Sequence, residues 1–160
     1  LLPGVGSFDH GINSLKNAPF FETLEKEVLE NKKPILGICL GMQLLTNSSE
    51  EGKEKGLGWI DAETVKFDLE DKSLSIPHMG WNKVNATNNN DIFKNLEDNR
   101  FYFVHSYHVV CNNEKNILAT ANYGKRFTCS IYKDNIYAAQ FHPEKSHKFG
   151  MQLLKNFGEM

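Results

Sequence analysis

Cysteine is scarce in this sequence, and charge of one sign is not in excess. The 160 residues include three cysteines, an odd and sparse set that does not suit a disulfide framework and favours a reducing cytoplasm. The formal net charge is -2, so the chain offers no broad electrostatic attraction to nucleic acid or to anionic lipid. We therefore expect a cytoplasmic protein that binds neither nucleic acid nor a membrane.

Long hydrophobic runs and internal divisions are missing too. The longest nearly apolar run, residues 35–45, contains Gln43 and is well short of the roughly 20 residues that cross a bilayer. No repeat, linker or low-complexity segment divides the sequence. With 40% hydrophobic and 24% charged residues, it suits one domain over 1–160.

The first part of the chain alternates strand and helix patterns. Residues 1–6 predict the end of an apolar strand that runs into a tight glycine turn. Hydrophobic residues recur at helical spacing over 21–29, and a short apolar run at 34–38 is typical of a buried strand. Good helix formers follow over 40–45. This order is typical of a crossover unit in a parallel sheet with helices on both faces.

After a polar stretch at 48–55, which we expect to be a solvated loop, the pattern changes to short strands. Clusters of Asn, Asp and Gly separate them, as in hairpins. The predicted strands cover 63–67, 74–76, 100–105, 117–123, 127–132 and 136–141. We expect a loop at 88–91 and one helical turn at 92–96. Ser146 should cap a last helix whose buried face consists of Phe149, Leu153, Leu154 and Phe157.

These elements together predict the α/β class. We expect a mostly parallel central sheet, flanked by helices, with additional antiparallel strands.

Cys39 falls where the predicted strand at 34–38 meets the helix at 40–45, and Gly37 and Gly41 flank it symmetrically. Gly-x-Cys-x-Gly is the thiol version of the elbow in which a strained strand-to-helix turn exposes a nucleophile. The first free N–H groups of the helix would face the sulfur and favour thiolate over thiol. The elbow alone leaves two interpretations equally open, an activated nucleophile or a small buried hydrophobic residue.

A thiolate needs an oriented acid and base, and His142 is the best placed of the six histidines. It follows the predicted strand 136–141, and sites gather at the carboxyl ends of strands in α/β sheets. Glu144, two residues on, can reach the far ring nitrogen. We therefore expect a triad of Cys39, His142 and Glu144, whereas His142 alone would be an ordinary strand-end histidine.

His105 and His108 could suggest a metal pair. Three residues apart on one strand they would point to opposite faces, and no thiolate or carboxylate cluster accompanies them, so we expect neither a metal nor another cofactor. The remaining histidines and cysteines are expected at the surface or a partner face (His10, His78, His147) or in structural positions (Cys111, Cys129).

The segment 37–43, GICLGMQ, together with His142-Pro-Glu144 resembles the class I (triad) glutamine amidotransferases, whose glutaminase domain is an α/β fold. Three further stretches, PHMGWN at 77–82, FYFVHSY at 101–107 and HPEKS at 142–146, are similar to the glutaminase subunit of imidazole glycerol phosphate synthase in histidine biosynthesis. The likeness runs from Pro3 to the final helix. That family has a strand, a helix and a strand before the PGVG turn, so we expect a single amidotransferase domain that lacks these elements.

The resemblance implies a reaction and a set of roles. Cys39 would attack the side-chain amide of L-glutamine, and His142, oriented by Glu144, would protonate the departing ammonia and then activate water against the thioester. Backbone N–H groups would hold the oxyanion, and other groups the amino-acid end of the substrate. The resemblance assigns the oxyanion contacts to Leu40 and the turn Gly4-Val5-Gly6. It assigns the contacts to the amino-acid end to Gln43, Ser106 and Tyr107. Without it, Gln43 would be a solvated helix residue and Ser106 an ordinary strand hydroxyl.

The resemblance also implies a partner, a (β/α)₈ barrel synthase subunit that forms a heterodimer with this chain and receives the ammonia. Met79, Trp81, Asn82 and Lys145 match positions that face this partner. A Trp amid polar neighbours is also a plausible interface anchor on physical grounds, although a core tryptophan is the alternative. Two other functions stay open: a paralogous glutaminase that feeds another synthase, for example in amidation of a surface sugar, and a non-catalytic docking module. The intact triad argues against the module.

Overall fold

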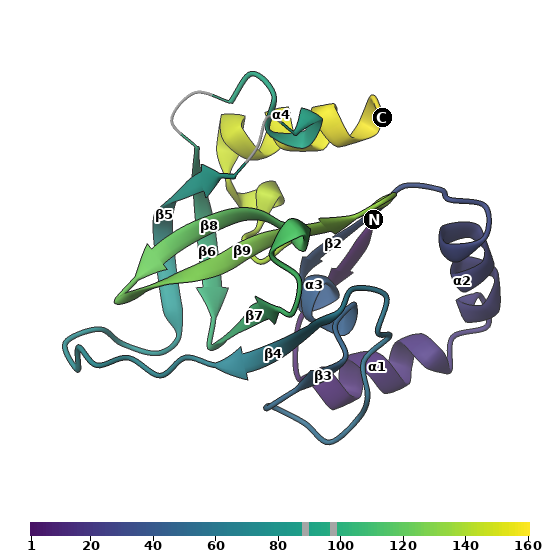
Figure 1. Cartoon of the computed structure of the whole chain (residues 1–160), viewed down its shortest axis with the longest axis horizontal. Helices are drawn as coiled ribbons and strands as arrows, with labels where there is room; N and C mark the ends of the chain where they lie inside the picture. The colour runs from purple at the N-terminus through teal and green to yellow at the C-terminus, as the bar shows by residue number, and fades with distance from the viewer. Residues whose placement is uncertain (88–89, 97–98) are drawn as a thin grey trace.

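The computed structural model describes residues 1–87, 90–96 and 99–160 (Figure 1). Within these residues a 10-stranded sheet curls around the core, and helices cover its two ends. The strands at one end are parallel: β1 (Leu2–Gly4), β2 (Ile35–Cys39) and β10 (Ile136–Ala139), with β2 in the middle. Their carboxyl ends therefore meet at one edge of the sheet, where sites form in α/β folds.

The rest of the sheet is mainly antiparallel. β9 pairs with β10, β8 and β7, β7 with β4, and β5 with β6 and β8, whereas β3 and β4 are parallel. The bounds are β3 Ser48–Ser49, β4 Ala62–Lys66, β5 His78–Ala86, β6 Arg100–His105, β7 Tyr107–Cys111, β8 Ile117–Tyr123 and β9 Lys125–Lys133. The predicted α/β class is confirmed. The predicted parallel pairing occurs in the strands around Cys39. Most other strand pairs are antiparallel, because hairpins connect them.

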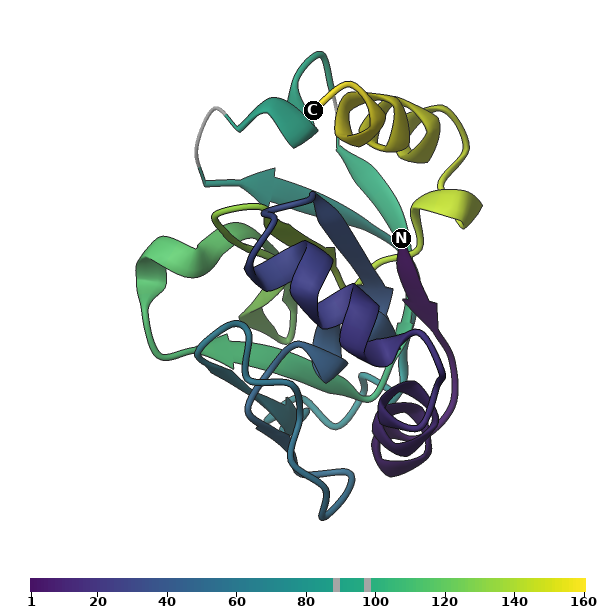
Figure 2. The ribbon, with the colours of Figure 1, turned by 90° about the vertical axis from the view of Figure 1, so that its right-hand side faces the viewer.

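Helices α1 (Phe8–Lys16), α2 (Phe21–Leu29) and the short α3 (Leu40–Leu44) pack around β1 and β2. Helix α4 (His147–Gly158) lies at the far end of the molecule from α1 (Figures 1 and 2). Three single turns of 3₁₀ helix complete the fold, Asp91–Phe93, Glu114–Asn116 and Pro143–Lys145. No helix of the described residues has both the length and the apolarity to span a bilayer.

Most of the strands and helices predicted from the sequence are confirmed within one to three residues, and 100–105 and 117–123 match fully. The prediction of a strand at 74–76 is wrong. Asp71 accepts hydrogen bonds from the backbone N–H and the hydroxyl of Ser73, at 2.9 and 2.6 Å, and this local turn displaces extended pairing. The loop predicted at 48–55 begins with β3, and the predicted helical turn at 92–96 is the 3₁₀ turn Asp91–Phe93. Of the loop predicted at 88–91, residues 88–89 lie outside the described part.

Besides β3 and the 3₁₀ turns Glu114–Asn116 and Pro143–Lys145, three elements escaped the sequence pattern: α1, β5 and β7. The N-terminus of α1 has no side-chain cap from Ser7; instead the carboxylate of Glu51 accepts the N–H of Phe8 at 2.8 Å. That cap comes from a loop 43 residues away, so local signals do not show it. β5 follows directly after Pro77 and its residues do not alternate clearly between apolar and polar.

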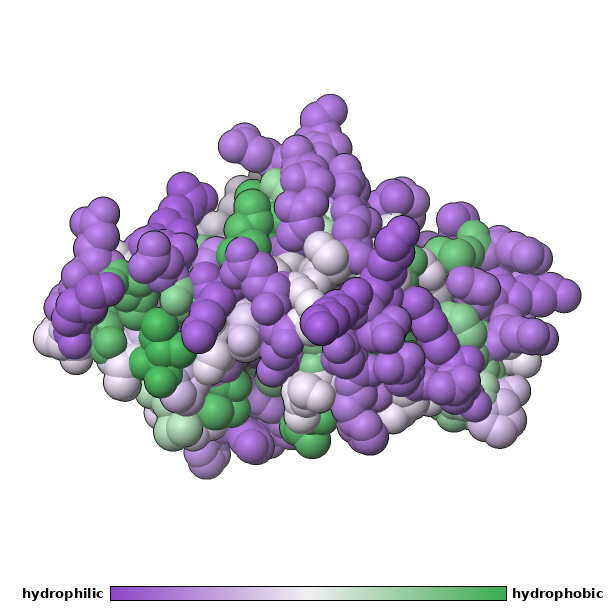
Figure 3. All heavy atoms as spheres, turned by 90° about the horizontal axis from the view of Figure 1, so that it is seen from below, coloured by the Kyte–Doolittle hydropathy of each residue, from purple (hydrophilic) through white to green (hydrophobic). Residues whose placement is uncertain are grey.

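Ser146 occupies the N-cap position of α4, as predicted, but its side chain makes no capping hydrogen bond. Its hydroxyl donates to the carbonyl of His142 at 2.6 Å and accepts the N–H of Tyr102 at 3.0 Å, so it ties the turn after β10 to β6. The helix does pack the predicted face onto the main core, with Leu153 buried and its apolar neighbours partly so. Seen from below, the protein surface is mostly hydrophilic, with separate apolar patches (Figure 3).

Three histidines, His78, His105 and His108, are buried around the ring of Phe67, with ring centroids 6.4, 5.3 and 4.7 Å away. The surface position predicted for His78 is therefore wrong. So is the prediction that His105 and His108 point apart, because they lie on different strands, β6 and β7. His10 and His147 are exposed, as predicted. Cys129 is fully buried and Cys111 is half-buried, both as free thiols packed in the core.

The hydrogen bonds among these histidines fix their tautomers. The carbonyl of Tyr107 only accepts, so His105 carries its proton on Nδ1, which donates at 2.7 Å. The amide nitrogen of Asn82 only donates, so Nε2 of His78 accepts at 3.2 Å and Nδ1 of His78 donates to Nε2 of His105 at 3.0 Å. The chain of bonds runs from Asn82 to Tyr107 through two neutral rings. Burial lowers the pKa of His78 to about 4 and that of His105 to about 3.

Burial also lowers the pKa of His108 to about 4, whereas the unfolded chain binds the proton near pH 6.5. Stability from His108 is therefore complete above pH 6.5 and is lost as the pH falls toward 4. We expect the replacement His108→Leu to reduce the fall in unfolding free energy by up to about 1.4 kcal/mol per pH unit in this window. Urea unfolding at several pH values between 7 and 4 measures the slope.

The exposed His10 offers the control, since His10→Gln should keep the slope of the original protein. A His108→Leu protein with an unchanged slope would contradict the assignment of His108 as a neutral buried group.

Candidate active site

A cavity of about 380 Å³ opens where the carboxyl ends of β1, β2 and β10 meet. It gathers segments that lie far apart in the chain. Its lining is Val5, Gly6, Cys39, Leu40, Gln43, Glu51, Pro77, Val104, His105, Ser106, Tyr107, His142 and Lys145. Nine of the residues predicted for the site or the partner face are in this set, and the bond register places Gly4 beside Cys39.

Cys39 sits in a strained elbow between β2 and α3. Its φ and ψ are 54° and -110°, a conformation that non-glycine residues rarely adopt and that costs about 1–3 kcal/mol. A Cβ atom at Gly41 would lie 1.8 Å from the carbonyl oxygen of Leu2, so β1 can approach only because position 41 has no side chain. The predicted elbow is confirmed.

The position of Cys39 at the start of a helix had predicted a thiolate. This prediction is wrong for the resting protein. Burial raises the pKa of the thiol to about 11, and the N–H of Leu40, which favours the anion, offsets this only in part. Helix α3 has five residues, so its N-terminal dipole is small. At neutral pH the thiol keeps its proton, and a base must take it during any reaction.

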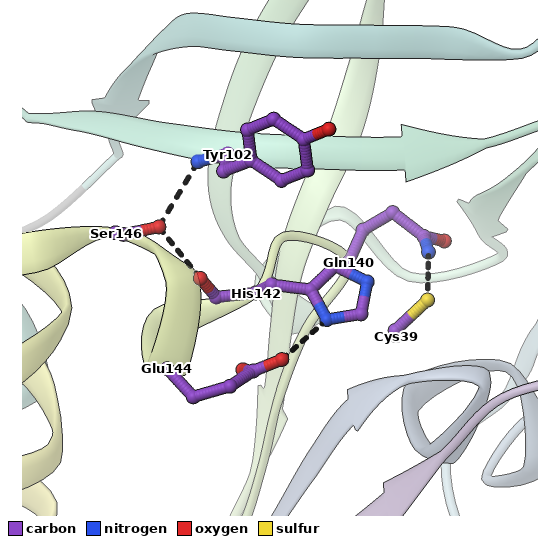
Figure 4. A network of polar contacts seen from close by, with 6 residues as sticks. All are labelled: Cys39, Tyr102, Gln140, His142, Glu144 and Ser146. Atoms are coloured by element: carbon purple, nitrogen blue, oxygen red, sulfur yellow. Dashed lines mark hydrogen bonds and ion pairs between the residues drawn. The ribbon is translucent and has the colours of Figure 1, made fainter.

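His142 and Glu144 are paired in the way that the predicted triad requires. Nδ1 of His142 lies 2.6 Å from Oε1 of Glu144, so that nitrogen carries the proton and Nε2 has the free lone pair. His142 is buried, and its Nε2 has no hydrogen-bond partner within the described residues. In Figure 4 the ring lies between Glu144 and the sulfur of Cys39. An unpaired buried nitrogen beside a protonated thiol is suited to proton transfer.

Gln43 is buried, which excludes the solvated helix position that was its alternative. Its Nε2 donates to Oε1 of Gln140 at 3.0 Å, and Nε2 of Gln140 in turn approaches Sγ of Cys39 at 3.8 Å. Sequence reasoning missed Gln140. The available signal was a single polar residue at the end of the apolar run 136–141.

Glu51 is a second missed residue of the cavity. It lies in the loop expected to be solvated, but its carboxylate accepts the N–H of Phe8, and Asp9 accepts the N–H groups of Lys53 and Glu54 at 3.0 Å. These reciprocal caps hold the loop against α1. Glu51 is the acidic group among the residues that line the cavity.

The remaining predicted site residues, Val5, Gly6, Ser106 and Tyr107, also line the cavity. Gly6 has φ +100°, which a side chain would disfavour, and the neighbouring Val5 is 80% exposed. Ser106 connects β6 to β7, and its carbonyl accepts the N–H of Phe67 at 3.0 Å. Tyr107 follows, with its carbonyl bound to His105. No cluster of three or more His, Cys, Asp or Glu that could hold a metal ion occurs in the part of the chain that the structure describes.

Of the residues predicted for a partner face, Lys145 lines the cavity, and Met79 pairs with Val104, which also lines it. Met79 and Trp81 are 61% and 48% exposed, so Trp81 is not a core tryptophan. The indole stacks on the exposed ring of His147 at 5.5 Å, and Nζ of Lys145 lies 6.0 Å from the ring of Tyr102. Asn82 differs: it is half-buried and bonded to His78 and to the carbonyl of Asn122.

Known proteins resemble this chain throughout. The family model described as "Glutamine amidotransferase class-I" matches residues 1–160. The imidazole glycerol phosphate synthase subunit HisH 2 of Methanococcus maripaludis is 60% identical over 98% of this chain and 78% of its own length. Subunit HisH of Leptospira borgpetersenii is 50% identical over 100% of this chain and 80% of its own length.

Solved structures show the same fold. A glutamine amidotransferase is 17% identical, with a TM-score of 0.67, over 98% of this chain and 77% of its own. A glutamine amidotransferase of Thermotoga maritima is 19% identical, with a TM-score of 0.60, over 98% of this chain and 60% of its own.

The close approach of β1 to the elbow predicts that one added methyl group at position 41 destabilises the fold. Gly41→Ala should force β1 and α3 apart, because the new Cβ would overlap the carbonyl of Leu2, and should lower the unfolding free energy by about 1–3 kcal/mol. Gly158→Ala is the control, since a Cβ there meets nothing within 4 Å. Equal urea midpoints for the two variants would show that β1 is not held against the elbow as described.

Proposed function

Because the chain belongs to the class I glutamine amidotransferases, we propose that it hydrolyses L-glutamine to glutamate and ammonia as the glutaminase subunit of an imidazole glycerol phosphate synthase. One observation carries the proposal: the free Nε2 of His142, whose ring is held by Glu144, faces the same cavity as the strained Cys39. The HisH relatives, 50% and 60% identical, support the pathway.

The first step forms a thioester. Nε2 of His142 takes the proton of Cys39 as the sulfur attacks the side-chain amide carbon of glutamine. The N–H of Leu40, which already faces the sulfur, stabilises the oxyanion together with an N–H from the turn Gly4-Val5-Gly6. One such donor contributes about 10²–10³ to the rate.

The second step releases the products. His142 gives its proton to the leaving nitrogen, so the C–N bond breaks and ammonia departs. His142 then takes a proton from water, whose oxygen attacks the thioester, and the thiol of Cys39 recovers that proton as glutamate leaves. Glu144 stabilises the imidazolium each time it forms, through the 2.6 Å bond to Nδ1.

The cavity offers complementary groups for the amino-acid end of the substrate. The carboxylate of Glu51 would pair with the α-ammonium group, and Gln43 would present its carbonyl oxygen, because its amide nitrogen is already bound to Gln140. Ser106 and Tyr107 border the same space with their backbone. These contacts hold the amide carbon above the sulfur.

The ammonia needs a protected route, because in water it is protonated and ceases to be a nucleophile. We propose that a (β/α)₈ barrel synthase subunit docks on the face formed by Met79, Trp81 and Lys145 and receives the ammonia there. Exposed apolar side chains beside the cavity support this, and aromatic residues of this kind often anchor interfaces. Asn82 would contribute through the strand it shares with Trp81.

Replacing the nucleophile tests the chemistry. Cys39→Ser should abolish glutamate release, because the hydroxyl is a far weaker nucleophile, and should leave binding of the partner subunit intact. Glutamate is measured with a coupled dehydrogenase, and complex formation by size exclusion. Full activity of the serine variant would mean that another residue attacks glutamine, and an inactive original protein that still binds a partner would indicate a docking module.

Replacing the exposed indole tests the partner face. Glutamine hydrolysis should be slow for the chain alone and much faster with the barrel subunit and its ligand. Trp81→Ala should weaken that complex by about 2 kcal/mol or more and reduce the stimulation, without changing the slow basal rate. Met151→Ala, at an exposed residue of α4, is the control. Stimulation that survives Trp81→Ala unchanged would move the interface elsewhere.

A further inference from the structure

The geometry points to a function for Gln140 that the motifs do not indicate: we infer that it is a positioning residue, which holds the sulfur of Cys39 with its amide N–H and links that sulfur to Gln43. The inference deepens the proposed glutaminase function and rests on it for its catalytic meaning. The contacts themselves involve this chain alone.

Gln140 occupies a fully buried position directly after β10. Its backbone N–H donates to the carbonyl of Cys129 at 2.9 Å, so the antiparallel neighbour β9 fixes where the side chain starts. A buried primary amide requires partners for both of its ends. Here they are Gln43 at the oxygen, 3.0 Å away, and Cys39 at the nitrogen, 3.8 Å away. Figure 4 shows the contact between Gln140 and Cys39.

The direction of these bonds suits the chemistry of the sulfur. In the structure the NH₂ group of Gln140 faces the sulfur and its carbonyl faces Gln43, which is the orientation that the thiolate formed during the reaction needs, because a thiolate only accepts hydrogen bonds. Gln43 must therefore donate with its own NH₂ group, which leaves its carbonyl for the cavity. The result is one chain in which each amide donates toward the sulfur. An N–H of the substrate that binds Gln43 would extend this chain and polarise it further.

The charges around Cys39 show why a neutral donor is useful. Burial raises the pKa of the thiol, the carboxylate of Glu144 raises it further, and Lys145 and the N–H groups of Leu40 and Gln140 lower it. His142 removes the proton only transiently. A buried amide stabilises the anion at a fixed position and adds no charge that would itself need solvation.

Alkylation of Cys39 by iodoacetamide measures this effect without substrate or partner, because only the thiolate reacts. The variant Gln140→Met keeps an unbranched side chain but has no N–H. At pH 8 we expect Cys39 to react about three-fold more slowly than in the original protein, the change that corresponds to a rise of about half a pKa unit. Peptide mapping by mass spectrometry resolves the cysteines, and Cys111 in the same digest should react at an unchanged rate.

Ser130→Ala is the matched control. Its hydroxyl donates to the carbonyl of Ala138 at 2.7 Å, so this change also removes a buried hydrogen bond at β10 but none at the sulfur. We expect it to lower the melting temperature and to leave alkylation of Cys39 unchanged. A Gln140→Met protein that melts like Ser130→Ala and alkylates Cys39 at the original rate across the pH range would overturn the inference and give Gln140 a packing role only.

A second variant protects the test against a folding failure. Gln140→Asn keeps the amide but shortens it by one methylene, so it should fold, lose contact with the sulfur and slow alkylation in the same direction. In glutaminase assays both variants should lower kcat more than they raise KM. Slower alkylation in the variants, together with an original protein that releases no glutamate, would support the positioning role and refute the proposed function. Normal glutamate release by the variants with unchanged alkylation would refute the positioning role alone.

Discussion

The reversal of the chain at Cys39 depends on three parallel strands that hold one strained residue in place. The φ of 54° persists because β1 and β10 bind β2 on both sides, and because the carbonyl of Leu2 fits against Gly41. The same arrangement places the turn after β1, the elbow after β2 and His142 after β10 at one edge. A single constraint therefore positions the proposed nucleophile, oxyanion turn and base.

That constraint also determines how the thiol can act. Close packing around the elbow removes water from the sulfur, and burial then outweighs the N–H groups that favour the anion. A cysteine that stays protonated at rest is protected from adventitious alkylation and oxidation. In the proposed mechanism it becomes reactive only when His142, Gln140 and a bound substrate act together. The nucleophile is thus controlled by the groups around it rather than by a permanently low pKa.

How far the sequence could predict the site depends on the range of the interactions. The elbow and the pair His142 and Glu144 were predictable, because each is a local pattern of a few residues with a known chemical purpose. Gln140 and Glu51 were not, because their partners lie 101 and 43 residues away and only the folded sheet brings them together. The error on the state of the thiol has the same origin, since a helix end is visible in a sequence and desolvation is not. For the fold, the turn at Asp71 and the tertiary cap of α1 overrode local propensity in the same way.

The buried histidines connect the exposed face to the cavity. Asn82 shares β5 with Met79 and Trp81, and its amide donates to His78, which donates to His105, which donates to the carbonyl of Tyr107. Each ring allows one tautomer, so no single hydrogen bond of the series can reverse its donor and acceptor when a residue at one end moves. Both rings pack against Phe67 in a dense aromatic cluster, which further limits independent movement. A displacement of β5 would therefore act through a rigid series of contacts that ends at Tyr107, a residue that lines the cavity together with Cys39.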